Sequence, residues 1–376
     1  MNPIRPCLAA LVFLLAGFGT AAETGAPVNP ALLYWQSLTS IPEITTVQAD
    51  AIKNAIRGYG EPQTLDAAGL ASYATMERLL RRATIPVRSC DWGLLLDEGP
   101  NMVLPHVSKI RELARRQLYL AEIDLHENRT QEGVDRLLTV HAMARHTVGI
   151  QPLLILVLVG QTIEMEAMQV AARHCQSWDR TTRLAYLGRQ RDLPPLPTAA
   201  QGVQGEKHLF DYVVKDGRLD QIPVFDKDVR QAWLALSHDP AAMRRSILAF
   251  VQSLDCMAKL MALPRAASLE AMQQLKVEAE AAGQSNPLIR LWIPIAANAQ
   301  DTTYKMRTIE NMLLAALEQG SDLDPAKAAA YRDALDGQPL QLVRGADNVL
   351  RLVTAGIYPK NPIELLLGHT RVAPMR

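Results

Sequence analysis

Glutamates and histidines on two neighbouring predicted helices are the first residues whose types and spacing could do chemistry. Glu122 and His126 are four residues apart, and His141 and His146 follow on the next helix. A catalytic zinc site needs about three such ligands that converge and leave one position open. The spacing fits neither His-Glu-x-x-His nor Glu-x-x-His, and His141 falls on an apolar stripe. We therefore expect core histidines here and no metal site.

The remaining catalytic patterns are also weak. Glu164 and Glu166 are two apart on a predicted helix, so they point to different sides and are unsuited to joint acid–base work. If either is buried, it needs a partner such as Arg145. No Gly-x-Ser-x-Gly or Ser-x-x-Lys motif places a serine for attack. Gly202 and Gly205 follow no predicted strand, as a phosphate-binding loop would require. We therefore assign no catalytic residue and no cofactor.

Two clusters of arginines occur at helical spacing and are candidates for binding. They comprise Arg78, Arg81 and Arg82 in one helix, and Arg111, Arg115 and Arg116 in another. Each cluster could attract an anion or an acidic peptide. The alternative is a solvated face, because Glu77 and Glu112 are interspersed among the arginines. We retain Arg111, Arg115 and Arg116 as the candidate partner-binding residues.

The elements that must position these residues are helical by composition. The chain has 376 residues, of which 48% are hydrophobic and only 5% aromatic, and good helix formers dominate. Lys and Arg number 39, as do Asp and Glu, so no overall field would attract nucleic acid. Few aromatic side chains are present to stack on bases. The composition predicts an all-α protein that does not bind nucleic acid.

The N-terminus is typical of a secretory signal peptide. Arg5 precedes an apolar run from Leu8 to Phe18, and small residues follow at Thr20, Ala21 and Ala22. The run is shorter than the ~20 residues that a membrane-spanning helix needs. We expect cleavage after Ala22, an exported and periplasmic mature chain, and no integral membrane span after cleavage.

Three cysteines remain once Cys7 leaves with the signal peptide. They are Cys90, Cys175 and Cys256, and disulfides persist in an oxidising compartment. Cys90 and Cys175 bracket one helical segment, so we expect these two to pair and Cys256 to stay free. The alternative is three buried, unpaired thiols. No nearby histidine activates Cys90 as a nucleophile.

The clearest structural pattern is a pair of amphipathic helices followed by an apolar helix. The pair covers 106–125 and 131–148, and a connection of about five residues requires the helices to pack antiparallel. A third helix, 152–175, begins with the apolar run 153–159. We expect protein to shield this run on all sides, which would make it the central core helix. Shorter helices are predicted at 30–38, 42–57 and 64–83.

A Pro-rich stretch at 194–197 is the best linker candidate, because it cannot continue a helix. Helices are predicted beyond it at 198–215, 228–236, 239–263, 266–282 and 299–318, and short strands at 340–343 and 349–353. The predicted organisation is a signal peptide (1–22), an N-terminal helical domain (23–193), the linker (194–197), a C-terminal helical region (198–335), a β-hairpin (336–357) and a loosely held tail (358–376).

Three local resemblances accompany this organisation. The segment 118–138, with Ala121 and Gly133 at the helix contact, resembles one tetratricopeptide hairpin. The motifs Cys-Asp-Trp-Gly at 90–93, Leu-Pro-His at 104–106 and Leu-Val-Gly at 158–160 with Glu164 resemble those of an uncharacterised family of exported bacterial proteins. The segment from Asp336-Gly337 is similar to the C-terminal strands of pseudopilin-like proteins. None of these resemblances implies an activity.

The sequence thus leaves two hypotheses of function. The first is a non-catalytic exported helical protein that binds a protein or peptide of the cell envelope in a groove between helices. The second is an exported hydrolase whose site is assembled from dispersed residues. Convergent acidic or imidazole groups with shifted pKa values around a concave site would favour the hydrolase, and a groove without them would favour the binding protein.

Overall fold

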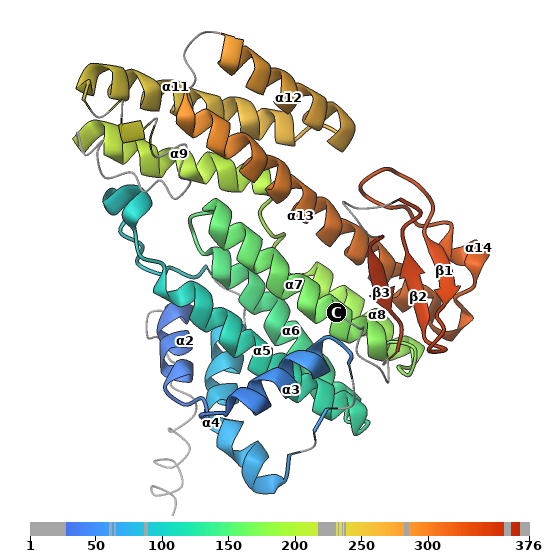
Figure 1. Cartoon of the computed structure of the whole chain (residues 1–376). Helices are drawn as coiled ribbons and strands as arrows, with labels where there is room; N and C mark the ends of the chain where they lie inside the picture. The colour runs from blue at the N-terminus through green and yellow to red at the C-terminus, as the bar shows by residue number, and fades with distance from the viewer. Residues whose placement is uncertain are drawn as a thin grey trace, which may run out of the picture.

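A computed structural model provides the structure of the chain (Figure 1). It describes residues 28–59, 62–63, 65–85, 89–216, 231, 233–234, 236, 238–281, 286–356 and 362–368. The predicted signal peptide and most of the helix predicted at 228–236 lie outside the described residues. Within them the chain is almost entirely helical with a small C-terminal sheet, which confirms the predicted fold class.

The first half of the chain folds into helices with well-defined starts. Asn29 caps the first of them ahead of Pro30, and Thr45 forms a reciprocal capping box with Gln48 in the second. The elements are α2 (Pro30–Leu38), α3 (Thr46–Ile56), α4 (Ala67–Thr84), η1 (Leu96–Asn101), α5 (Pro105–His126), α6 (Thr130–Val148), α7 (Leu154–His174) and α8 (Arg180–Arg191).

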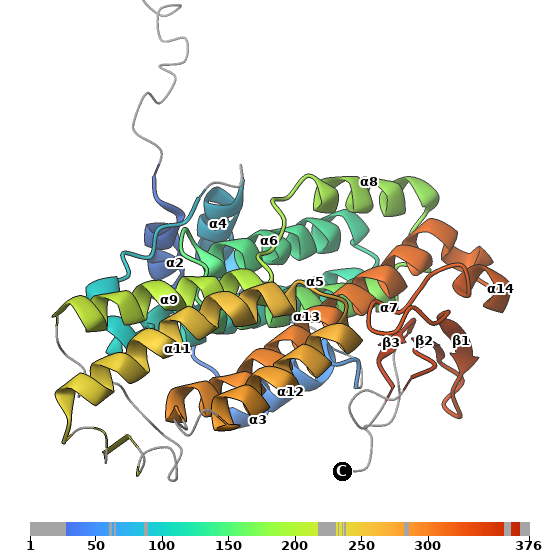
Figure 2. The same ribbon diagram turned by 90° about the horizontal axis from the view of Figure 1, so that it is seen from above.

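The second half adds long helices and then strands. The elements are α9 (Ala199–Asp216), α11 (Pro240–Met261), α12 (Arg265–Ala281), α13 (Pro287–Gln319), η3 (Gly320–Asp322), α14 (Pro325–Ala328), β1 (Gln341–Arg344), β2 (Leu350–Val353) and β3 (Glu364–Leu366). Figure 2 shows α9 and α11 side by side, with α12 along the first half of α13. The strands form an antiparallel sheet in the order β1-β2-β3. The third strand lies in the stretch that the sequence assigned to a loose tail.

The hairpin of α5 and α6 forms as predicted. Residues 127–129 join the two helices, and Gly133 packs so closely on Leu125 that a Cβ at Gly133 would lie 2.5 Å from the Leu125 Cγ. The small residue therefore sets the distance between the helices. The hairpin packs on α7, which contacts both of its helices.

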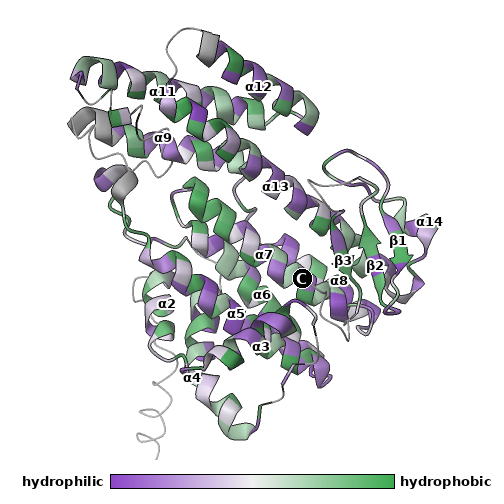
Figure 3. Cartoon of the chain, in the orientation of Figure 1, coloured by the Kyte–Doolittle hydropathy of each residue, from purple (hydrophilic) through white to green (hydrophobic). Residues whose placement is uncertain are grey.

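Helix α7 is the core element, although it is not shielded on all sides. Leu156 is fully buried, whereas the adjacent Ile155 is 46% exposed, which corrects the expectation for the whole apolar run. Neighbours of α7 include α5, α6, α9 and α13, and its first half is strongly apolar (Figure 3). Among the described residues, α7 is the one helix apolar and long enough to cross a bilayer, and 61% of that apolar stretch is buried inside the protein.

The buried residues form clusters that cross the Pro-rich stretch at 194–197. The first cluster contains residues of helices α2 through α8, of the end of α13 and of the sheet. The second contains residues of the start of α7, of α9 and α11, and of the first half of α13. Helix α9, which follows the Pro-rich stretch, packs closely against the start of α7, which precedes it. A Cβ on Gly205 of α9 would lie 2.1 Å from the Pro152 carbonyl oxygen. Helix α13 runs through both clusters, with Pro294 inside it.

The predicted disulfide is wrong, because Cys90, Cys175 and Cys256 are all free thiols. Cys90 lies beside Gly149, just before α7, whereas Cys175 follows the last residue of α7. The 21 residues of α7 span about 30 Å at 1.5 Å per residue, and a disulfide needs Cα atoms within ~7 Å. Cys90 and Cys175 are buried, as the alternative prediction had it, while Cys256 is exposed.

Candidate functional site: a cationic cavity

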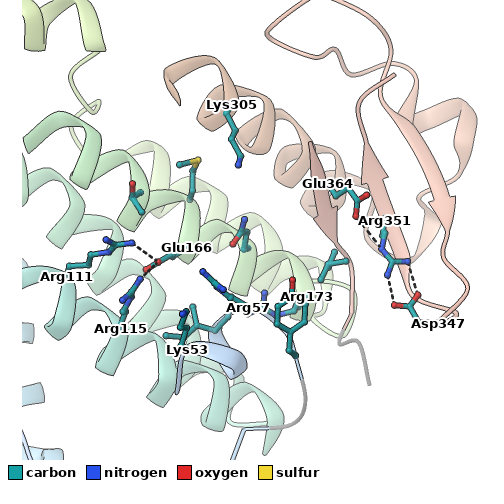
Figure 4. Close-up of a pocket in the computed structure, with 16 residues that line it drawn as sticks. Lys53, Arg57, Arg111, Arg115, Glu166, Arg173, Lys305, Asp347, Arg351 and Glu364 are labelled. Carbon is teal, nitrogen blue, oxygen red and sulfur yellow. Dashed lines mark hydrogen bonds and ion pairs between the residues drawn. The ribbon is translucent and has the colours of Figure 1, made fainter. Parts of the chain in front are cut away.

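A concavity with a volume of about 740 Å³ lies where α3, α5, α7, α13 and the sheet meet (Figure 4). Typical small-molecule sites have volumes of ~300–1,000 Å³. Its floor comes from α7, whose residues Thr162, Met165, Glu166, Gln169 and Arg173 recur at helical spacing and so share one face. We call this concavity the cationic cavity.

The charge of the described lining residues is strongly unbalanced. Seven cationic side chains face three carboxylates. The cations are Lys53, Arg57, Arg111, Arg115, Arg173, Lys305 and Arg351, and the carboxylates are Glu166, Asp347 and Glu364. Since charges of one sign that line a concavity concentrate the field inside it, the cavity attracts anions although the whole chain has no net charge.

Glu166 lies between two arginines of α5. Its Oε1 accepts a hydrogen bond from Nη2 of Arg115 at 3.1 Å and lies 3.8 Å from Nη2 of Arg111. The hydrogen-bonding capacity of this group is not exhausted, because Oε2 of Glu166 and Nε of Arg111 are buried without a partner among the described residues. One carboxylate thus serves two guanidinium groups, which leaves one positive charge uncompensated.

Two further cations are neutralised by the protein itself. Arg173 pairs with Glu122, a fully buried carboxylate that also contacts Nε2 of His174 at 2.7 Å. Arg351 on β2 pairs with Asp347 at 2.5 Å and faces Glu364 at 3.7 Å. The wall formed by the sheet therefore has one cation and two carboxylates, and it carries no surplus of positive charge.

The remaining three cations, Lys53, Arg57 and Lys305, have no carboxylate partner among the described residues. Lys53 and Arg57 are one helical turn apart at the end of α3, and Lys305 reaches into the cavity from α13 (Figure 4). The surplus positive charge therefore gathers in the half of the cavity between α3, α5 and α13.

The structure divides the three arginines that were predicted to bind a partner. Arg111 and Arg115 line the cavity. Arg116 does not belong with them, because it is only 4% exposed and its Nη2 lies 3.6 Å from Glu112. Adjacent positions on a helix differ by about 100°, so Arg115 and Arg116 cannot share a face.

Glu164 and Glu166 point to opposite sides of α7, as predicted. Glu164 is buried and pairs with Arg145, while Nδ1 of His141 lies 2.9 Å from its Oε2. Nε2 of His141 in turn contacts the hydroxyl of Tyr186 at 2.6 Å. Burial alone would raise the pKa of Glu164, but the charges of His141 and Arg145 outweigh it and lower the pKa to about 2.

The chain Tyr186–His141–Glu164 resembles a proton relay in its geometry but has no access to a substrate. His141 and Tyr186 are fully buried, and neither is among the residues that line the cationic cavity. We interpret this chain as a hydrogen-bonded polar group inside the helix bundle with a structural role. Burial raises the pKa of the Tyr186 hydroxyl.

The other histidines lie in separate places. His146 accepts or donates a 2.7 Å hydrogen bond with the Tyr34 hydroxyl, while His126 is exposed at the end of α5. Within the described ranges, no group of three or more His, Cys, Asp or Glu residues could hold a metal ion.

The motifs around Trp92 and His106, which carried the family resemblance, meet in one aromatic cluster. The two rings stack at 4.4 Å, and Nε1 of Trp92 donates a hydrogen bond to the carbonyl of His146 at 2.6 Å. Burial lowers the pKa of His106 to about 4. This cluster fastens the loop before α5 to the end of α6, which is a structural role.

In comparisons with known proteins, no protein-family model, curated protein or solved structure matches the chain. The resemblances to tetratricopeptide, exported bacterial and pseudopilin-like proteins therefore stay predictions.

Sequence reasoning missed most of the cavity. Lys53 and Arg57, Lys305, and Arg351 come from three separate stretches of the chain, and each is an ordinary surface residue in its local pattern. The spacing of Lys53 and Arg57, one turn apart at a helix C-terminus, is the only local signal, and it is common because cations favour that end.

Proposed function

We propose that this chain is a non-catalytic binding protein of the cell envelope that holds an anionic ligand in the cationic cavity. The observation that carries the proposal is the convergence of Lys53, Arg57 and Lys305, which have no carboxylate partner among the described residues, with the Arg111–Glu166–Arg115 group. Bringing like charges together destabilises a fold, so their convergence is accounted for if a ligand supplies the missing negative charge.

The proposal includes the export of the chain and a partner outside the cytoplasm. Its support is the charged start, apolar run and small residues at 1–22. N-terminal sequencing of the native protein should find Glu23 as the first residue. Retention of Met1 on a cytoplasmic protein would contradict the location, although it would leave the cavity argument intact.

The absence of catalysis rests on where the unusual acidic and imidazole groups lie. Glu164 and Glu206, whose pKa values are shifted to about 2 and about 7, are buried away from the described cavity lining. A hydrolase would need such groups at the concave site. Chromatography of candidate ligands after incubation with the protein checks this point, since the appearance of products would favour the hydrolase.

Calorimetric titration with multivalent anions tests the binding itself. Pyrophosphate, citrate and an acidic peptide are suitable probes at low ionic strength, where charge attraction is least screened. At least one should bind, and Arg57→Ala combined with Lys305→Ala should weaken it by at least about tenfold. Arg82→Ala is the matched control, because Arg82 is an exposed cation of α4 that does not line the cavity. Binding of none of the probes, or equal loss in the control, would overturn the proposal.

A further inference from the structure

The cations with surplus charge approach one space from three directions. Lys53 and Arg57 come from α3, Arg111 and Arg115 from α5, and Lys305 from the opposite side on α13 (Figure 4). Residues four apart on a helix have Cβ atoms about 6 Å apart, so each pair on α3 and α5 presents two donors along one edge of the space. The donors therefore face the space from three elements and do not lie along a single edge.

This arrangement fits a phosphoryl group better than a carboxylate. The two oxygens of a carboxylate lie in one plane, so a single guanidinium fork can satisfy them both. A phosphoryl group presents three oxygens that point in different directions, and it therefore accepts hydrogen bonds from cations on several elements at once. Arginine forks are also the side chains most suited to phosphate.

The charge of this half of the cavity sets the number of phosphoryl groups. Five cations face the single carboxylate of Glu166, which leaves a net charge of about +4 on the described residues. A phosphoryl group carries about −1.5 to −2 near pH 7. Two phosphoryl groups compensate this charge, whereas one would leave about half of it unmatched.

The opposite wall is suited to the neutral part of the ligand. Arg351 is already paired with Asp347 and Glu364, and Tyr59 and Gln169 add polar side chains to the cavity lining. Carboxylate oxygens, a phenol and an amide can exchange hydrogen bonds with hydroxyl groups. The two carboxylates would repel a third anionic group on this side.

We propose that the ligand of the cationic cavity is a polyhydroxylated molecule with two phosphoryl groups, which lie between α3, α5 and α13 while the hydroxyl groups face the sheet. The proposal rests on the proposed function of anion binding. The same chemistry is presented by a soluble sugar bisphosphate and by a lipid headgroup that bears two phosphoryl groups.

Calorimetric titration of the mature chain with fructose bisphosphate, fructose monophosphate and citrate tests the ligand class. We expect the bisphosphate to bind at least about tenfold more tightly than either of the other two, since it alone matches the charge and the directions of the donors. Equal or tighter binding of citrate would overturn the phosphoryl assignment and leave anion binding intact. Failure of every anion to bind would remove the proposed function as well.

Variants of the lining sharpen the same measurement. Glu166→Gln removes the one carboxylate of this half, and we expect the bisphosphate to bind about fivefold more tightly to it. Arg57→Ala and Lys305→Ala should each weaken binding about tenfold, while Arg82→Ala should leave it unchanged. Thermal unfolding without ligand shows whether each variant is folded. Weaker binding to folded Glu166→Gln would mean that Glu166 itself holds the ligand, against the proposal.

Flotation with vesicles distinguishes the two sources of the ligand. Phosphatidylcholine vesicles that contain a phosphatidylinositol bisphosphate present a polyhydroxylated ring with two terminal phosphoryl groups. Flotation that fructose bisphosphate abolishes assigns the lipid source, and binding of the soluble bisphosphate without flotation assigns the soluble source. Flotation that the soluble bisphosphate does not compete would place lipid binding on another surface and contradict the proposal.

Discussion

The inner and outer faces of the α5–α7 bundle treat charge in opposite ways. On the inner face, Glu164 is matched by Arg145 and His141, and Glu122 by Arg173. Glu166, two residues after Glu164 on α7, lies on the cavity face and contacts two arginines. The lysines and Arg57 that line the same cavity have no carboxylate partner among the described residues. The difference teaches that burial enforces charge matching, while a solvated concavity permits a surplus that a ligand can use.

The largest effect should come from placing a charge on the inner face. Leu156→Asp removes an apolar side chain, which costs about 2–5 kcal/mol, and then buries a carboxyl group at further cost. We expect the free energy of unfolding to fall by at least about 5 kcal/mol in urea titrations. Ile155→Asp is the control on the outer side, because Ile155 is 46% exposed. Similar losses in both variants would show that α7 has no inner and outer face.

The paired glutamates of α7 give the next largest difference. Glu164→Ala leaves Arg145 and His141 without their buried partner, which should destabilise the fold by about 3–5 kcal/mol. Glu166→Ala leaves Arg111 and Arg115 without a carboxylate, but both arginines line a solvated cavity. The stability should therefore change by less than about 1 kcal/mol. Chemical denaturation of both proteins decides the matter. A larger loss for Glu166→Ala would contradict the contrast between the faces.

Glu206 is a buried carboxylate whose pKa is raised, whereas that of Glu164 is lowered. The contribution of Glu206 to the stability of the fold should therefore depend on pH in the opposite direction. Its side chain caps α7 by accepting a hydrogen bond from the Leu154 amide at 2.8 Å, and burial raises its pKa to about 7. A pKa that is raised on folding adds stability below the unfolded value of 4.5, and this contribution is lost as the pH rises through 7.

The size of the effect is up to about 3 kcal/mol, at 1.4 kcal/mol per pKa unit. Glu206→Gln keeps an acceptor for the amide but cannot ionise, so its stability should not fall over this range. Subtracting the urea stability of the variant from that of the wild type at each pH isolates the contribution of Glu206 from that of His106, which both proteins share. A difference that stays constant between these pH values would show that Glu206 is not buried in a neutral form.

The cysteines extend the comparison to reactivity, with the smallest effect on stability. Cys256 is exposed and should react first with an alkylating reagent, whereas burial raises the pKa of the Cys90 and Cys175 thiols to about 12. Mass spectrometry before and after unfolding should count one and then three modified thiols. A peptide that joins Cys90 to Cys175 would restore the bridge that the structure lacks.

Elements with strong local signals could be predicted from the sequence. The hairpin of α5 and α6 and the core helix α7 have regular apolar spacing, and Glu164 and Glu166 diverge because two residues are about 200° apart on a helix. The first turns of α13 could not be predicted in this way, since Pro294 interrupts the pattern and yet stays inside the helix. Neighbouring packing overrides that local preference.

The failures have a different physical cause. Strand β3 has only three residues and is specified by its pairing with β2, which no local pattern reveals. The cavity likewise depends on long-range packing. Lys53 on α3 and Lys305 on α13 line the same space only because both helices pack on α7. Sequence spacing could group Arg111 with Arg115, which both line the cavity, because they lie on a single helix.

Helix α13 also gives the molecule a mechanical property. Its 33 residues form a strut about 50 Å long that begins in one buried cluster, ends in the other and carries Lys305 between them. Lys305 lies about 27 Å from the start of the strut, so a tilt of a few degrees at the cavity displaces that end by about 2 Å. One continuous helix therefore joins the cavity to the region where α11 and α12 pack.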